Sequence, residues 1–363
     1  MIPKDTYQTV LKQFKKNHWI GKKIIATVSG GIDSMALCYI LKNIDAPFVI
    51  AHCNFQLRGK ASDGDAEFVE KWANENNIPF YIQKFETPAL LENGGNLQDL
   101  CRTLRYEWFE QLRTQIHYDY IATAHHQQDA VETVLMNLIK GTGISGLHGI
   151  APHNGAIIRP LLTVTKKQLL EVLNVNDSNW REDSSNAKDD YIRNKIRHQL
   201  IPAIEHINPK AVQNIFNTSV RIADSEKLLA IPIKQLINKV IEVKGQDVYI
   251  PILKLQQQDG YQMLLWEICK HYGFTSSQME DIYLLTEAHT GKYVQSSSHR
   301  IIKNRKHFII TSNNKLESKH IIIDSWEHSD TISLSNFQLH FKTAKDIELD
   351  TLNNLSCAIN PKT

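Results

Sequence analysis

The chain has 363 residues, 42% of them hydrophobic, and its 41 basic and 39 acidic side chains nearly cancel. This length fits two or three domains, and the charge balance excludes a general electrostatic attraction to nucleic acid, so any such surface must be local. The five cysteines form no Cys-x-x-Cys pair, which argues against a zinc knuckle, an iron–sulfur site and a disulfide framework.

Apolar and helical stretches alternate along the first part of the chain, after an amphipathic helix predicted over residues 2–18. Five apolar stretches are predicted to be strands: residues 24–28, 47–51, 79–84, 120–124 and 156–158. Helices are predicted over about residues 33–41, 62–76, 96–114 and 129–140, with Ser62 and Asp63 as caps of the second. The alternation indicates an α/β fold of Rossmann type, with a parallel five-stranded sheet covered by helices on both faces.

The pattern becomes mainly helical from residue 165, and helices are predicted over residues 211–243, 261–272 and 277–288. Residues 291–320 then carry a local basic cluster opposed only by Glu317: Lys292, Arg300, Lys303, Arg305, Lys306, Lys315 and Lys319. Alternation around residues 301–302 and 308–310 predicts a β-hairpin within this cluster. Residues 316–363 contain short strands and form a β-rich segment.

A glycine-containing loop joins the first predicted strand to the first predicted helix, and its residues are Ser29, Gly30, Gly31, Ile32, Asp33 and Ser34. Adjacent glycines let the backbone turn sharply and bring its amides close to an anion. The helix adds unpaired N–H groups and the positive end of its dipole, so a phosphate is the expected ligand. The alternative is a tight turn in which Asp33 or Ser34 caps the helix.

Polar residues also follow the second and fourth predicted strands, where ligands bind in parallel sheets. Asp129 and Glu132 lie one helical turn apart and can face one ligand, either Mg²⁺ or an ammonium group, although Asp-x-x-Glu also fits a helix cap. His125 and His126 point in opposite directions if they continue a strand, so one of them is expected to contact the nucleotide and the other to be structural.

Arg193 and Arg197 are spaced to share one face of a helix. The planar guanidinium group suits a phosphate or an adenylate. The alternative is a solvated or salt-bridged helix face.

The loop at residues 29–34 resembles the pyrophosphate (PP) loop of the N-type ATP pyrophosphatases, and residues 20–210 as a whole are similar to the tRNA(Ile)-lysidine synthase family. The signatures that carry the resemblance, in chain order, are residues 29–34, His52-Cys53-Asn54 with Leu57-Arg58-Gly59, Arg102 with Arg105 and Tyr106, residues 124–133, Arg159-Pro160-Leu161-Leu162, Trp180 with Asp183, Ser185 and Asn186, and Tyr191 with Arg193, Asn194 and Arg197. Phe55 stands where many members carry a histidine.

The resemblance implies an ATP-dependent ligase that adenylates C2 of the wobble cytidine of tRNA(Ile) and then joins L-lysine to it. It implies that ATP is bound by Ser29, Gly30, Gly31, Ile32, Asp33, Ser34, His125 and Arg197, that Mg²⁺ is held by Asp33 and Asp129, and that Asp33, Asp129, Glu132 and Arg193 are catalytic. It implies a catalytic domain over residues 1–210, a tRNA-binding domain over residues 211–315 and a partial, truncated β-rich domain over residues 316–363. Arg102, Arg105 and Tyr106 either contact tRNA or anchor their helix.

Two alternative functions remain compatible with the sequence. A tRNA thiolation enzyme of the same fold would need paired or catalytic cysteines, for which Cys53 or Cys101 alone is a weak candidate. A nucleotide-binding module without catalysis would need fewer polar groups at the strand ends. The chain lacks an apolar signal segment and any run near about 18 apolar residues, which predicts a cytoplasmic protein with no membrane partner. The sequence leaves open whether the protein is a monomer or a homodimer.

Overall fold

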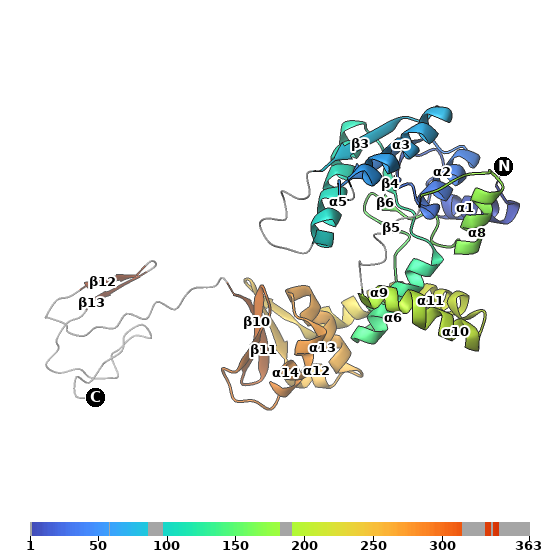
Figure 1. Ribbon diagram of the computed structural model, residues 1–363. Coiled ribbons are helices and arrows are strands. Elements are labelled where there is room, and N and C mark those ends of the chain that lie inside the picture. The colour runs from blue at the N-terminus through green and yellow to red at the C-terminus, as the bar shows by residue number, and fades with distance from the viewer. Residues whose placement is uncertain are drawn as a thin grey trace, which may run out of the picture.

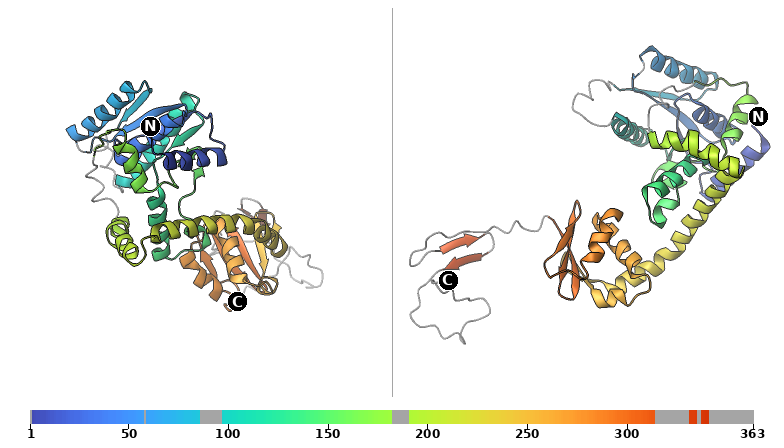
Figure 2. Two further views of the ribbon diagram at one scale, coloured as in Figure 1. Left: turned by 90° about the vertical axis from the view of Figure 1, so that its right-hand side faces the viewer. Right: turned by 60° about the horizontal axis from the view of Figure 1, so that its bottom comes forward.

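The computed structural model describes residues 2–57, 59–85, 97–181, 191–313, 331–334 and 337–340. Figures 1 and 2 show an α/β body, a smaller body of helices and antiparallel strands, and the long helix α11 (Ala211–Val240) that runs from one to the other. In the part of the chain that is described, no helix has both the length and the apolar composition needed to cross a membrane.

The first sheet has the strand order β3-β2-β1-β4-β6-β5. Its members are β1 (Ile24–Thr27), β2 (Phe48–Asn54), β3 (Phe80–Lys84), β4 (Tyr120–Ala122), β5 (His153–Asn154) and β6 (Ile157–Ile158). The five predicted parallel strands are confirmed, and the short strand β5 adds an antiparallel edge beside β6. The strand order reverses between β1 and β4.

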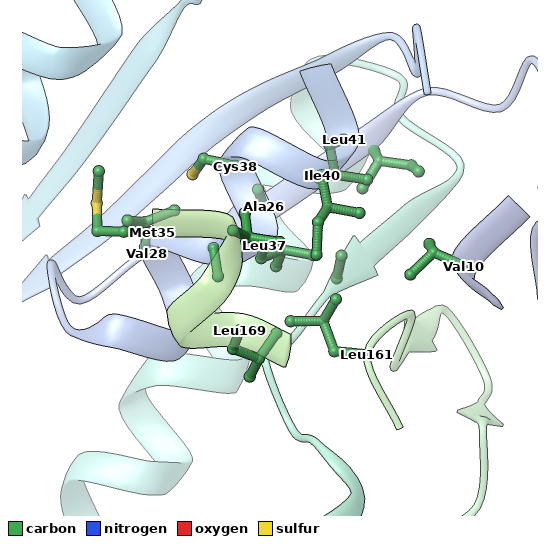
Figure 3. Close-up of a cluster of buried hydrophobic side chains, with 14 of the residues drawn as sticks. Val10, Ala26, Val28, Met35, Leu37, Cys38, Ile40, Leu41, Leu161 and Leu169 are labelled. Carbon is green, nitrogen blue, oxygen red and sulfur yellow. The ribbon is translucent and has the colours of Figure 1, made fainter. Parts of the chain in front are cut away.

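Helices cover both faces of this sheet, as predicted. On one face lie α1 (Lys4–Lys16), α2 (Ile32–Asn43), α3 (Lys60–Glu75) and α8 (Lys166–Asn174), and on the other lies α5 (Leu97–Gln115). Alternate residues of β1 face opposite ways, because Ile24 and Ala26 belong to the first core and Ile25 to the second. Figure 3 shows side chains of α2 pointing toward Leu161 and Leu169 of the α8 region.

The start of α3 differs from the prediction. The helix begins at Lys60, before Ser62 and Asp63, with Gly59 as its N-cap at φ 52°. The prediction that Ser62 and Asp63 cap this helix is therefore wrong. The helix starts before these two residues because its N-cap is Gly59, a glycine at positive φ. Asp63 instead accepts a hydrogen bond from the side-chain amide of Asn54 at 2.9 Å.

The helices α6 (Gln127–Lys140) and α7 (Ile144–Leu147) contact the first half of α11. Before α11 the chain forms α9 (Tyr191–Lys195), a π-helical turn (Ile196–Leu200) and α10 (Ile201–Ile207).

The smaller body contains a five-stranded antiparallel sheet in the order β7-β8-β11-β10-β9. Its elements are β7 (Glu242–Lys244), β8 (Asp247–Pro251), β9 (Tyr293–Gln295), β10 (His299–Asn304), β11 (His307–Ser312), α12 (Ile252–Gln256), α13 (Tyr261–Cys269) and α14 (Met279–Leu284). The predicted hairpin is confirmed as β10 and β11, with Ile301 paired to Ile310. Beyond it, β12 (Thr331–Leu334) pairs with β13 (Phe337–His340), whereas Lys315, Glu317 and Lys319 lie outside the described residues.

Candidate active site

The candidate site lies where the strand order of the first sheet reverses. Because β1 and β4 are parallel neighbours, the loops at their carboxyl ends lie side by side. The first loop leads into α2 and the second into α6. Residues from both loops, from α8 and from the region of α9 meet at this edge.

The loop before α2 is held in shape by Ser34. Its hydroxyl oxygen accepts hydrogen bonds from the N–H groups of Ser29 (3.3 Å) and Gly30 (3.2 Å) and donates to the carbonyl of Gly31 (3.0 Å). Gly30 has φ +93°, a conformation that disfavours any other residue. Gly31 is the N-cap of α2, and as a glycine it has no side chain that could cap the helix. Asp33 and Ser34 lie after the N-cap, in the first turn, so the alternative in which one of them is the N-cap of α2 is wrong.

Asp33 lies in the first turn of α2 with 34% of its side chain exposed. Its Oδ1 is 2.6 Å from Nζ of Lys166, and its Oδ2 is 3.7 Å from Nε2 of His126. Lys166 was missed in the sequence. The local signal that points to it is a pair of lysines in the first turn of α8, where the helix dipole disfavours positive charge.

His126 and Asp129 cap α6. The carboxylate of Asp129 accepts the N–H of His126 at 2.9 Å, and Nδ1 of His126 accepts the N–H of Gln128 at 3.2 Å. The capping alternative for Asp129 is thus present. Nε2 of His126 also lies 3.6 Å from Asp129 and 3.7 Å from Asp33, so the two carboxylates face the same imidazole.

His125 points elsewhere, with Nδ1 2.8 Å from the hydroxyl of Thr123. Burial, with nearby arginines as a smaller cause, lowers the pKa of His125 to about 4, so its ring is neutral at pH 7. Burial raises the pKa of Asp129, but His126, whose N–H its carboxylate accepts, and Arg193 hold that pKa below its usual value. Asp129 is therefore charged.

Glu132 holds two arginines. Its side chain is fully buried, and its oxygens accept hydrogen bonds from Nε of Arg193 (2.9 Å) and from Nε and Nη2 of Arg197 (2.6 and 2.8 Å). Both arginines also reach Oδ1 of Asp129, at 3.4 and 3.3 Å. Burial lowers the pKa of Arg197, but the contacts with Glu132 outweigh it and raise that pKa. The predicted shared face of Arg193 and Arg197 is turned toward two carboxylates.

Other residues singled out in the sequence have aromatic partners, although the charge of Arg102 also acts on His125. The Arg102 guanidinium lies 5.2 Å from the ring centre of Tyr106, and that of Arg105 lies 5.4 Å from the ring of Phe55. Phe55 stacks on Phe85 with ring centres 4.8 Å apart. These contacts anchor the side chains of Arg102 and Arg105 to neighbouring aromatic rings.

A second residue missed in the sequence is Arg181. Its N–H donates to the carbonyl of Gly30 at 3.0 Å, and its guanidinium forms an ion pair with Asp65 of α3. Arg181 thereby ties the segment after α8 to the loop before α2. Asp183, Ser185 and Asn186, which belong to the same sequence signature, lie outside the described residues.

The donors at this site suit a magnesium ion better than a zinc ion. Within the described ranges no group of three or more His, Cys, Asp or Glu side chains could hold a metal. Mg²⁺ usually takes one or two carboxylates and completes its shell with phosphate oxygens and water. Asp33 and Asp129, each with one oxygen within 3.7 Å of Nε2 of His126, fit that requirement.

Comparisons with known proteins agree on one family. The chain matches the model of the PP-loop domain over residues 3–204 and that of the TilS substrate binding domain over residues 243–314. It is 36% identical over 304 residues to a tRNA(Ile)-lysidine synthase of Parabacteroides distasonis, covering 84% of this chain and 69% of that protein. A relative of the same name from Bacteroides thetaiotaomicron is 36% identical over 301 residues, covering 82% of this chain and 70% of that protein.

One solved structure shares the fold at low sequence identity. It is the U34-tRNA thiolase NcsA from Methanococcus maripaludis, with a TM-score of 0.53 and 18% identity over 61% of this chain and 79% of that chain. This similarity shows a common fold and no more.

Proposed function

Because the chain belongs to the tRNA(Ile)-lysidine synthase family, we propose that it joins L-lysine to C2 of the wobble cytidine of tRNA(Ile), converting ATP to AMP and pyrophosphate. The observation that carries this proposal is the meeting of the α2 N-terminus, whose N-cap is a glycine, with two carboxylates and two arginines at one edge of the sheet. Such a reaction needs the leaving pyrophosphate neutralised and the cytidine oxygen held in line with the α-phosphorus.

The loop would bind the phosphates of ATP. The amides of Gly31 and Ile32 and the dipole of α2 would act on the pyrophosphate portion, whereas the N–H of Gly30 is engaged with the Ser34 hydroxyl inside the loop. Ser34 holds the loop from inside, since its hydroxyl is engaged with the loop backbone, whereas the side chain of Ser29 is exposed to a ligand. Asp33 and Asp129 would hold Mg²⁺, which when bound supplies positive charge for the phosphate oxygens.

Arg193 and Arg197 would bind the α-phosphate and the adenylate. Buried Glu132 fixes both guanidinium groups, so we assign it a positioning role. Held in this way, the planar groups lose little freedom when they meet phosphate oxygens. Neutral His125 suits a contact with the uncharged part of the nucleotide.

The smaller body would bind the tRNA through exposed basic side chains. Arg305 and Lys306 are exposed at the turn between β10 and β11, and Lys292 is exposed just before β9. Lys303 is less suited, because its ammonium donates to the carbonyl of Thr286 at 2.9 Å. Contacts of this kind with phosphates supply much of the affinity for nucleic acid.

Sulfur transfer is the alternative that the described cysteines do not favour. Burial raises the pKa of Cys53 and Cys269 to about 12 and raises that of Cys38 further. Their thiols are therefore protonated at pH 7, whereas sulfur chemistry needs a thiolate.

The reaction would take place in the cytoplasm, where tRNA, ATP and free lysine occur together. Sedimentation velocity with and without tRNA measures the oligomeric state and tests for a homodimer.

The test of the proposed function is the incorporation of radiolabelled lysine into tRNA(Ile) with ATP and Mg²⁺. We expect label in tRNA with a wobble cytidine and none in a transcript with a wobble uridine or in a reaction without ATP. Label that does not depend on the cytidine, or no label with the complete mixture, would refute the assignment.

A further inference from the structure

Lys166 connects α8 with the start of α2. Its Nζ lies 2.6 Å from Oδ1 of Asp33, although the two residues are 133 positions apart. Both side chains are about one third exposed, at 36% and 34%. The ion pair therefore lies at the accessible side of the loop before α2, where a ligand can reach both groups.

The backbone at Lys166 is fixed relative to this loop. Thr165 and Gln168 form a capping box at the start of α8, with hydrogen bonds of 3.0 and 3.2 Å. Leu169 and Val172 of α8 are fully buried in the same core as Leu37 of α2. Only the flexible four-carbon stem of Lys166 is left to adjust the position of its ammonium group.

The position of Lys166 is unfavourable for its own helix. The first turn of α8 contains Lys166 and Lys167 and no acidic residue. A cation there opposes the positive end of the helix dipole. Residues that break a local rule while the rest of the element obeys it are typical of functional sites.

We propose that Lys166 is a phosphate-binding residue, whose ammonium group neutralises Asp33 without nucleotide and passes to the oxygens of the pyrophosphate portion when ATP binds. The inference rests on the proposed function. The Asp33 carboxylate lies 2.6 Å from the ammonium group of Lys166 and 3.7 Å from Nε2 of His126, and the charge of Arg197 also acts on it. A cation that takes the carboxylate of Asp33 displaces the ammonium group, and the nearest new anions are the phosphates in the loop.

Binding of inorganic pyrophosphate in buffer with excess Mg²⁺, the cation that would take the Asp33 carboxylate, tests this role apart from catalysis when it is measured by isothermal titration calorimetry. Lys166→Met should weaken pyrophosphate binding about tenfold or more, the loss expected for one charge-assisted hydrogen bond. Lys167→Met is the matched control, since it removes the same charge from the next, exposed position and should change binding less than about twofold. Lys166→Arg should retain binding.

Three results would overturn the inference: wild-type affinity in Lys166→Met, an equal loss in both methionine variants, or no binding to the wild type at millimolar pyrophosphate. Thermal unfolding establishes that each variant is folded. If Lys166→Met is not folded, Lys166→Gln replaces it. Lysine incorporation by the wild type tests the proposed function separately. If the wild type makes lysidine and Lys166→Met binds pyrophosphate with wild-type affinity, the role of Lys166 is refuted and the proposed function stands.

Discussion

Glu132→Gln is the substitution whose effect follows most directly from the structure. It removes the charge of a fully buried carboxylate at nearly constant volume. Three hydrogen bonds of 2.6 to 2.9 Å join this carboxylate to Arg193 and Arg197. An amide accepts through one atom only, and its NH₂ group would face a guanidinium, donor against donor.

The expected loss of stability can be bounded. Removing one partner of a buried ion pair costs about 3–5 kcal/mol. Arg193 and Arg197 are 32% and 33% exposed, so water and nearby Asp129 take over part of the interaction, and we expect a loss of about 2–3 kcal/mol. For a domain the size of residues 3–204, this lowers Tm by about 4–12 °C.

Differential scanning calorimetry measures this change. The control is Glu75→Gln, because Glu75 is exposed on α3 and lies 3.9 Å from Lys71, and surface changes of this kind cost less than about 0.5 kcal/mol. A Glu132→Gln variant that melts within about 1 °C of the wild type would show that this network does not hold α9 and the π-helical turn against α6.

Three further predictions concern catalysis, tRNA binding and pH. Asp33→Asn should slow tRNA-dependent pyrophosphate release about 100-fold or more. The control Asp45→Asn, at an exposed position just beyond the C-terminal end of α2, should leave this rate unchanged. An Asp33→Asn variant that releases pyrophosphate as fast as the wild type would remove Asp33 from the mechanism. Reversing the charges of Arg305 and Lys306 should weaken tRNA binding in filter assays and flatten its salt dependence, and an unchanged salt slope would exclude this surface. The pKa of His125 is lowered from 6.5 to about 4, so between these pH values the unfolded chain binds one proton more than the folded chain, and stability falls as the pH falls. In this pH range the Tm of His125→Asn should therefore decline less steeply than that of the wild type. Parallel curves of Tm against pH would contradict the lowered pKa.

The apolar runs of the chain were enough to predict the five parallel strands and the β10–β11 hairpin. Strand residues such as Ile24 and Ile25 are buried on opposite faces, so both must be apolar, and that requirement is visible in a short stretch of sequence. The turn before α2 was predicted for a similar reason, because the positive φ of Gly30 needs glycine. These features depend on neighbours in the chain.

The strand order, the contacts of the charged residues and the start of α3 were decided by the tertiary structure. Whether Asp129 caps a helix or faces a ligand could not be predicted, because the same Asp-x-x-Glu spacing serves both, and only the packing of α9 against α6 brings Arg193 within reach. Lys166 meets Asp33 only because α8 packs on α2. Periodicity reports which face of an element is buried, whereas a charge acts on whatever the folded chain places within a few ångströms, and that distance is not written in any local pattern.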